Sequence, residues 1–499
     1  MFPEELEFIA PGQVRTRFAP SPTGVLHVGG ARTALFNYLF AKKNRGSFVL
    51  RIEDTDIERS KPEYEKDIVE SLKWLGIESD ENPEKGGRYG PYRQREKLES
   101  YTAYLEKLLQ EDKAYYCFCS EDELEAQRQD QQSRGETPKY SGKCRNLAKE
   151  EAEKRLKAGQ PSVIRFKIPE KKVKFHDLIR GQVEFDNSLS GDIVIAKSLT
   201  LPLYNIAVVV DDFEMKISHV IRGEEHISNT PKQIALQEAL GITPPQYAHI
   251  PLILAPDRSK LSKRHGAVSV LEYRKEGYLP ETLINFLAFL GWNPGGEREI
   301  YSLASLTKEF SLERIQKGGA IFNIQRLDYL NGFYIRQRSG EKLAELCLPY
   351  LIEAGLLAPG RIGLDFVQKV ISLHQERLKK LSEITELAGF FFKDDLEYDR
   401  ELLKWKDMSE KEIAESLEKT AKLLRAMKED WQKENLENLL LPEAEKTGDR
   451  GRLLWPLRVA LSGKKASAGP FEIAATLGKE KTLERIEKAL AKIKRAAII

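Results

Sequence analysis

The hydrophobic pattern near the N-terminus predicts a strand, a helix and a second strand. Residues 14–18 alternate as a strand does, and residues 27–43 carry apolar side chains at helical spacing before Gly46. Residues 48–52 form a second apolar strand pattern. Strand, helix and strand in this order predict a βαβ unit, which implies a parallel sheet with a right-handed crossover.

The segment from about residue 97 to 205 changes in character. It begins with charged helical patterns and continues with short strand patterns at 164–168, 183–185 and 192–195. We therefore expect an α+β insertion within the sheet domain. The run 206–210 is fully apolar, which is typical of a buried parallel strand, so we expect the chain to return there to the first sheet.

Strand patterns become scarce after about residue 251. Residues 281–290 form an amphipathic helix pattern that ends at Gly291, and from about 336 onward one helix pattern follows another. The patterns together predict an α/β multidomain protein. It has a parallel-sheet domain, an inserted α+β segment and an all-α C-terminal region.

Composition excludes several classes of protein. The 499-residue chain is 41% hydrophobic and 31% charged, which argues against global disorder. No apolar run reaches the roughly 18 residues of a membrane helix, and the acidic N-terminus lacks the basic region of a secretory signal. Four cysteines do not make a disulfide framework in a chain of this length. We expect a cytoplasmic protein without a membrane partner. Its net charge of +2 does not by itself indicate a nucleic-acid ligand.

A loop rich in proline, glycine and serine lies between the first predicted strand and the first predicted helix. Gly29 and Gly30 at the helix start let a ligand approach the backbone closely. Free N–H groups and the positive end of the helix dipole attract phosphate there, and His27 can add a hydrogen bond. This loop is predicted to bind a phosphate.

A second motif, Lys260-Leu261-Ser262-Lys263-Arg264, follows an apolar strand pattern and a turn. Three cations and a hydroxyl on one loop can gather around a triphosphate. Phosphoryl and adenylyl transfer need such groups, because negative charge grows on the phosphate oxygens and on the leaving pyrophosphate.

The two motifs together resemble the signatures of one enzyme class. His27-Val28-Gly29-Gly30 resembles the HIGH signature of class I aminoacyl-tRNA synthetases, and Lys260–Arg264 resembles their KMSKS signature. The surrounding sequence is similar to bacterial-type glutamyl-tRNA synthetase from about residue 13 to the C-terminus. The strings that carry this likeness are Arg17–Gly24, Arg51–Asp56, Gly90–Gln94, Val209–Asp212, Val220–His226 and, in the helical part, Pro456–Gly463.

The signatures also show departures. Gly30 stands where HIGH has its last histidine, Leu261 where KMSKS has methionine, and Arg264 where it has the final serine. With one imidazole fewer, Lys263 and backbone amides would carry more of the charge stabilisation.

The resemblance implies a set of site residues. His27, Lys260 and Lys263 would be catalytic, and ATP would be bound by His27, Gly29, Gly30, Lys263 and Arg264. For glutamate, two arginines and one acid complement two carboxylates and one ammonium. The family positions are Arg17 for the side-chain carboxylate, Arg222 for the α-carboxylate and Glu53 for the amino group, with Ala19, Ser21 and Tyr204 lining the pocket.

The resemblance also assigns roles to the parts of the chain. Residues 13–96 and 206–250 would form the two halves of a Rossmann-like catalytic domain. Residues 97–205 would be the insertion that binds the acceptor end of tRNA. Residues 251–335 would contact the tRNA stem and carry the KMSKS-like loop, and residues 336–499 would be the helical anticodon-binding region.

Three cysteines and a tyrosine form a third constellation. Cys117, Cys119 and Cys144 supply thiols, and relatives with a C-x-C and Y-x-x-x-C arrangement make Tyr140 the candidate fourth ligand of a zinc ion. Tyrosine is a poor zinc ligand unless its phenol ionises. The alternative is a metal-free remnant in which the cysteines pack as small apolar side chains.

The implied function is ATP-dependent ligation of L-glutamate to tRNA(Glu) through a glutamyl-adenylate, with Mg²⁺ accompanying ATP. A monomer is expected. One alternative is a non-discriminating enzyme that also charges tRNA(Gln). A second is a non-catalytic tRNA-binding relative. A third is a small-molecule nucleotidyltransferase or tRNA-independent glutamate ligase, which the long helical region disfavours.

Overall fold

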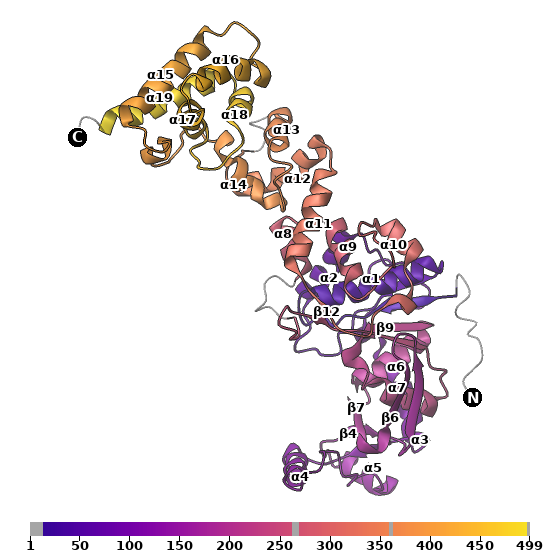
Figure 1. The fold of residues 1–499 in the computed structure, drawn as a ribbon. Helices are drawn as coiled ribbons and strands as arrows, with labels where there is room; N and C mark the ends of the chain where they lie inside the picture. The colour runs from indigo at the N-terminus through magenta and orange to yellow at the C-terminus, as the bar shows by residue number, and fades with distance from the viewer. Residues whose placement is uncertain (1–12, 262–268, 359–362, 497–499) are drawn as a thin grey trace. The chain divides into compact units, whose positions relative to one another are not determined.

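The computed structural model describes residues 13–261, 269–358 and 363–496 (Figure 1). These residues form two compact units. One contains the chain up to Arg274 together with Pro280–Ile324, and the other contains Lys275–Leu279 and the chain from Gln325 onward. Among the described residues, no helix is long and apolar enough to cross a membrane.

The first unit is built on a sheet with the strand order β2-β1-β9-β10-β5-β6 among its described residues. Neighbouring strands run parallel from β2 to β5, and β6 is antiparallel to β5. The order confirms the expected parallel sheet and adds an antiparallel hairpin at one edge. The strands are β1 (Arg15–Phe18), β2 (Ser47–Leu50), β5 (Lys172–Asp177), β6 (Gly181–Asp186), β9 (His219–Gly223) and β10 (Gln246–Ile250).

The expected βαβ unit is confirmed by β1, helix α1 and β2. Helix α1 (Val28–Lys43) buries Leu35, Phe36 and Leu39 completely. Helix α2 (Pro62–Leu75) follows β2, and α9 (Pro280–Phe289) and α10 (Leu303–Glu309) pack against α1 (Figure 1).

The prediction of a strand at 206–210 is wrong, because these residues lie in helix α6 (Tyr204–Glu214). Ile206, Ala207, Val209 and Val210 all belong to one buried cluster with residues of α3 and β4. A helix that is buried all round shows no polar face, so its sequence loses the 3.6-residue period that would distinguish it from a buried strand. Helix α7 (Thr230–Leu240) then connects β9 to β10.

The segment expected as an insertion has the predicted mixture of helices and strands. It contains an antiparallel sheet in the order β3-β4-β7-β8 among the described residues, covered by helix α3 (Leu98–Gln110). The β5–β6 hairpin of the same segment pairs instead with β10 of the main sheet. The remaining elements are β3 (Ala114–Cys117), α4 (Glu121–Ser133), α5 (Lys149–Lys157), β4 (Val163–Phe166), β7 (Ile193–Ser198) and β8 (Leu201–Pro202).

The chain beyond residue 251 is mainly helical, as expected. Strands β11 (Ile253–Leu254) and β12 (Ala320–Ile321) pair in parallel, and helix α8 (Val270–Glu276) lies between them in sequence. The second unit encloses its own apolar core. Its helices begin within α11 (Ile324–Arg336) and continue as α12 (Gly340–Glu353), α13 (Leu364–Ser372), α14 (Ile384–Ala388), α15 (Glu410–Ala426), α16 (Lys433–Glu445), α17 (Gly451–Ser462), α18 (Pro470–Leu477) and α19 (Lys479–Ala496).

Candidate active site

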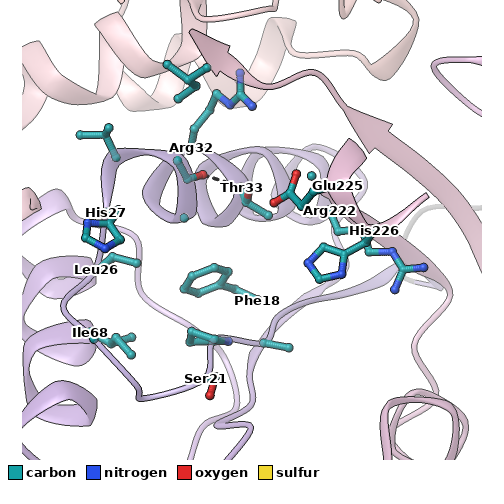
Figure 2. A pocket seen from close by; sticks show the side chains of 18 of the residues that line it. Phe18, Ser21, Leu26, His27, Arg32, Thr33, Ile68, Arg222, Glu225 and His226 are labelled. Carbon is teal, nitrogen blue, oxygen red and sulfur yellow. Dashed lines mark hydrogen bonds between the residues drawn. The ribbon is translucent and has the colours of Figure 1, made fainter. Parts of the chain in front are cut away.

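A cavity of about 790 Å³ opens where β1 and β9 end (Figure 2). Ligands of open parallel sheets bind at this edge, outside the carboxyl ends of the strands. The structure brings ten residues singled out from the sequence to this cavity. They are Arg17, Ala19, Ser21, His27, Gly29, Gly30, Glu53, Tyr204, Arg222 and Lys260. Lys263 and Arg264 lie outside the described residues.

The start of helix α1 faces the cavity with uncapped backbone. His27 precedes the helix in an extended conformation and makes no side-chain cap, and the first turn holds no acidic residue. A Cβ added at Gly29 would meet nothing within 4 Å, whereas one at Gly30 would lie 3.0 Å from the Leu26 side chain. Gly29 therefore leaves room for a ligand, and Gly30 allows the loop to pack closely. The side chain of His27 lies at one end of the cavity, away from Arg222 (Figure 2).

The floor beside β1 holds a buried network of charges. Arg17 donates to Asp212 at 3.1 and 3.4 Å, and Arg51 donates to the same carboxylate at 2.7 Å. Arg51 also donates to Glu53 at 2.9 Å. Burial raises the pKa of Asp212, but Arg17 and Arg51 outweigh it and hold that pKa below its usual value. Burial raises the pKa of Glu53, although Arg51 opposes this.

The second acid of helix α6 anchors the other side of this network. Asp211 accepts hydrogen bonds from Lys97 at 2.7 Å, Gln94 at 2.8 Å and Tyr101 at 2.9 Å. Arg51 lies 3.6 Å from it. Neither acid was predicted as a site residue. The sequence feature that could have identified them is a pair of adjacent acids directly after an apolar run. Such acids need hydrogen-bonding partners when the helix is buried.

Arg222 approaches the cavity from β9 and is almost fully buried. Its Nη2 donates to Thr230 Oγ1 and Gln233 Oε1, both at 2.8 Å, and its Nε donates to His249 Nε2 at 3.2 Å. Its Nη1 has a longer contact of 3.5 Å with the Tyr204 hydroxyl. The sequence identified Arg222 and Tyr204 but missed the three residues that hold the guanidinium.

His226 and Arg32 are further residues of the cavity that were not predicted. His226 Nδ1 lies 3.2 Å from the Tyr204 hydroxyl, and burial lowers the pKa of His226 to about 4, so its ring is neutral at pH 7. Arg32 also lines the cavity (Figure 2), but its Nη1 donates to the carbonyl of Leu290 at 2.8 Å. Arg32 therefore braces α1 rather than supplying charge to a ligand.

Lys260 lies on the loop that follows β11 and is exposed. The loop is held to β11 by the Leu261 amide, which donates to the Ile253 carbonyl at 3.2 Å. This bond directs the chain along the cavity just before the undescribed residues 262–268.

The three cysteines and Tyr140 converge on one point away from the cavity. The sulfurs of Cys117, Cys119 and Cys144 lie within 4.8 Å of one another, with Cys119 and Cys144 3.7 Å apart. The Tyr140 hydroxyl lies 3.4 Å from Cys117 Sγ and 3.5 Å from Cys119 Sγ. Two sulfurs bound tetrahedrally at 2.3 Å from zinc would be about 3.8 Å apart. The cluster therefore has a size that fits a metal ion.

Two groups of this cluster, the Cys119 thiol and the Tyr140 phenol, are protonated without a metal. Burial raises the pKa of Cys119 to about 11, and burial also raises the pKa of Tyr140. Burial opposes ionisation of Cys117 too, but hydrogen bonds from Tyr140 and the charge of Arg165 hold the pKa of that thiol below its usual value. The Arg165 guanidinium lies 3.9 Å from the centre of the Tyr140 ring. A bound dication would displace these protons, because metal binding requires the deprotonated ligands.

Comparisons with known proteins agree with the geometry. The family described as tRNA synthetases class I (E and Q), catalytic domain, matches residues 13–329, and an anticodon binding domain matches residues 342–490. The chain is 48% identical to glutamate–tRNA ligase 1 of Caldicellulosiruptor saccharolyticus, covering 95% of this chain and 98% of that protein. It is 47% identical to glutamate–tRNA ligase 2 of Thermoanaerobacter pseudethanolicus, covering 96% and 98%.

A solved structure supports the same assignment. The fold matches the crystal structure of a glutamate tRNA ligase from Elizabethkingia meningosepticum in complex with its amino acid. The TM-score is 0.86 and the identity 36%, with 96% of this chain and 99% of that chain covered. The cavity holds Arg17 and Arg222 beside the uncapped start of α1. Because the family model also matches more than half of its length, the chain belongs to the class I tRNA synthetases of the glutamate and glutamine group.

Proposed function

We propose that this chain ligates L-glutamate to tRNA(Glu) in an ATP-dependent reaction. The observation that carries the proposal is the meeting of Arg17, Arg222 and Glu53 in one cavity with the uncapped start of α1. The near full-length similarity to glutamate–tRNA ligases supports it. The cavity thus combines groups for an amino acid with two carboxylates and groups for a phosphate chain.

Glutamate binds through charge complementarity. Arg17 and Arg222 bind its two carboxylates, and Glu53 binds its ammonium. Arg17 uses Nε and Nη2 on Asp212, so within the described part of the chain Nη1 remains for the substrate. Ala19, Ser21 and Tyr204 line the same cavity. Arg17 is fixed by the buried acid Asp212, and Arg222 is fixed by the neutral side chains of its buried partners. Because both cations are held before glutamate arrives, little reorganisation is needed on binding.

The chemistry takes two steps. An α-carboxylate oxygen of glutamate attacks the α-phosphorus of ATP, the bond to the bridging oxygen breaks, and pyrophosphate leaves. The terminal ribose hydroxyl of tRNA then attacks the carbonyl carbon of the adenylate, loses its proton, and AMP leaves. His27, Lys260 and Lys263 stabilise the phosphate charge, with Gly29, Gly30 and Arg264 contributing to ATP binding. Mg²⁺ bound with ATP supplies further charge neutralisation on the phosphates.

The other parts of the chain serve tRNA. Residues 97–205 bind the acceptor end, residues 251–335 contact the stem, and residues 336–499 read the anticodon. Unpaired loop bases are the main source of sequence recognition in RNA, which suits a helical unit separate from the chemistry. The enzyme acts as a monomer in the cytoplasm, and tRNA(Gln) is a second candidate substrate.

Cys117, Cys119, Tyr140 and Cys144 bind one structural zinc ion in this proposal. The separations of the four ligand atoms support tetrahedral coordination. All four residues lie outside the cavity, so the metal orders the small sheet rather than taking part in the reaction.

Aminoacylation assays test the function. Purified chain is incubated with ATP, Mg²⁺ and either glutamate or glutamine, using tRNA(Glu) and tRNA(Gln) side by side. Glutamylation of tRNA(Glu) is expected, and Arg17→Gln should raise the KM for glutamate while the KM for ATP stays unchanged. Charging with glutamine only, or no charging of either tRNA, would overturn the proposal.

A further inference from the structure

We infer that His249 and Asp177 are positioning residues that fix the guanidinium of Arg222 and thereby set the affinity for glutamate. The inference rests on the proposed binding of a glutamate carboxylate by Arg222. Neither His249 nor Asp177 lines the cavity, and both are fully buried. They act through Arg222 and do not touch the substrate.

The backbone register places these three residues in a row across the sheet. His249 of β10 is the direct partner of Arg222 on the parallel strand β9, so their side chains share one face. On the other side of β10, Asp177 ends strand β5, whose pairing with β10 joins Asp177 to Tyr247. The β5–β6 hairpin therefore brings a carboxylate next to the histidine from 72 residues away.

Asp177 determines which nitrogen of His249 carries the proton. Its Oδ1 accepts backbone N–H bonds from Ile179 at 2.9 Å and Arg180 at 2.8 Å, and its Oδ2 accepts the N–H of His249 at 3.1 Å. Burial opposes ionisation of Asp177, but these bonds and His249 hold its pKa below the usual value. An ionised carboxylate only accepts, so His249 Nδ1, at 2.6 Å from Oδ2, must donate.

The consequence is an acceptor at His249 Nε2. A neutral imidazole with a proton on Nδ1 carries a lone pair on Nε2, and Arg222 Nε donates to it at 3.2 Å. Burial lowers the pKa of His249, which keeps the ring neutral at pH 7. Thr230 Oγ1 also lies 3.0 Å from Nε2. With the proton on Nε2 instead, that N–H could donate to Thr230 but would face the Arg222 Nε–H donor, and Arg222 would have to turn.

The remaining contacts of Arg222 show what the fixed orientation achieves. Thr230 and Gln233 take both protons of Nη2, and His249 takes the proton of Nε. Nη1, with its single long contact to Tyr204 among the described residues, is left as the edge available to a ligand. A guanidinium fixed on two of its nitrogens points the N–H groups of the third in a set direction, which favours binding of a carboxylate oxygen there.

Two substitutions of His249 separate positioning from packing. In His249→Gln the side-chain amide reaches the position of Nε2 and can accept from Arg222, whereas in His249→Asn it reaches only the position of Nδ1. We expect His249→Asn to raise the KM for glutamate by about tenfold or more, the usual effect of losing a hydrogen bond to a charged group. The KM for ATP should stay unchanged, and His249→Gln should restore most of the glutamate affinity.

Asp177→Asn provides a second variant that does not alter His249. Two backbone N–H groups hold Oδ1, so the new NH₂ group would take the place of Oδ2 and face His249 Nδ1. The histidine proton would then move to Nε2, opposite the Arg222 donor. We expect the glutamate KM of this variant to rise as in His249→Asn, with the ATP KM unchanged.

Controls distinguish failure of this inference from failure of the proposed function. His219→Gln replaces a different buried histidine, which lies on β9 and whose Nδ1 contacts Ser218, and should leave both KM values unchanged. Arg222→Gln should raise the glutamate KM; if it does not, the proposed glutamate site is wrong. If Arg222→Gln has this effect but His249→Asn and His249→Gln behave alike, or glutamate and ATP KM rise together, the positioning role is wrong. Glutamate-induced thermal stabilisation gives the same comparison without catalysis.

Discussion

Arg17 and Asp212 form a two-point ion pair inside the first unit, although 195 residues separate them in the sequence. The pair joins strand β1 to helix α6, and both side chains are about 95% buried. Arg51 completes the arrangement by donating to the same carboxylate. Arg17, the cation proposed to bind substrate, is thus held by a buried carboxylate of the protein itself. This ion pair fixes the orientation of the guanidinium before glutamate arrives.

Asp212→Asn should destabilise the first unit. It removes the negative charge shared by Arg17 and Arg51, and breaking a buried ion pair in this way costs about 3–5 kcal/mol. The free energy of unfolding in urea, followed by tryptophan fluorescence, measures the loss. The matched control Glu70→Gln disrupts an exposed pair with Arg274 and should cost less than about 1 kcal/mol. Equal losses of unfolding free energy in the two variants would show that the buried pair contributes no more to stability than the exposed pair.

Gly29→Ala should affect stability and ATP binding in opposite directions. Replacing glycine by alanine inside a helix stabilises it by up to about 1 kcal/mol, and the new methyl group meets no atom of the described residues within 4 Å. The methyl group would instead occupy space beside the backbone N–H groups proposed to bind phosphate. A higher melting temperature combined with a raised ATP KM is expected. An unchanged ATP KM would place the phosphates elsewhere.

Zinc should be present at one ion per chain and should depend on Cys144. Elemental analysis of the purified protein measures the metal directly. Cys144→Ser should lose the metal and lower the melting temperature, because structural zinc contributes to folding. Cys347→Ser removes a cysteine buried in helix α12 and should keep the full metal content. If the wild-type protein is as stable without metal as with it, the cysteines instead pack as small apolar side chains and hold no structural ion.

His374 should make the second unit sensitive to mild acid. Its ring is buried, neither nitrogen has a hydrogen-bond partner among the described residues, and burial lowers its pKa to about 4. Between pH 6.5 and 4 the unfolded chain takes up a proton that the folded chain does not, so stability falls as the pH falls. The loss attributable to this group is about 1–3 kcal/mol.

Replacing His374 by leucine tests this origin. The difference in unfolding free energy between pH 7 and pH 4.5 should be smaller in His374→Leu than in the wild type, measured by urea unfolding at each pH. An identical pH dependence in the two proteins would mean that other groups cause the acid sensitivity.

The local elements of this protein follow directly from its sequence. β1, α1 and β2 can be predicted because the hydrophobic period of each element and the turn residues that end it lie within a short stretch of sequence. The helical C-terminal region was predicted for the same reason. The strand predicted at positions 206–210 is wrong, because a helix buried on all sides has no polar face to mark its period, and packing rather than pattern decides its type.

The site divides in a similar way. The motifs around His27, Gly29 and Lys260, together with Arg17 and Arg222, could be identified from short strings, since their chemistry is carried by neighbours in sequence. The partners that orient them could not. Asp212 reaches Arg17 from helix α6. His249 reaches Arg222, and Asp177 reaches His249, because the sheet order sets β9 beside β10 and β10 beside β5. Sequence alone identified the charged residues Arg17, Glu53, Arg222 and Lys260 that line the cavity. Only tertiary structure decided which acid or imidazole fixes each one, because a buried charge takes as its partner whatever the fold places within hydrogen-bonding distance.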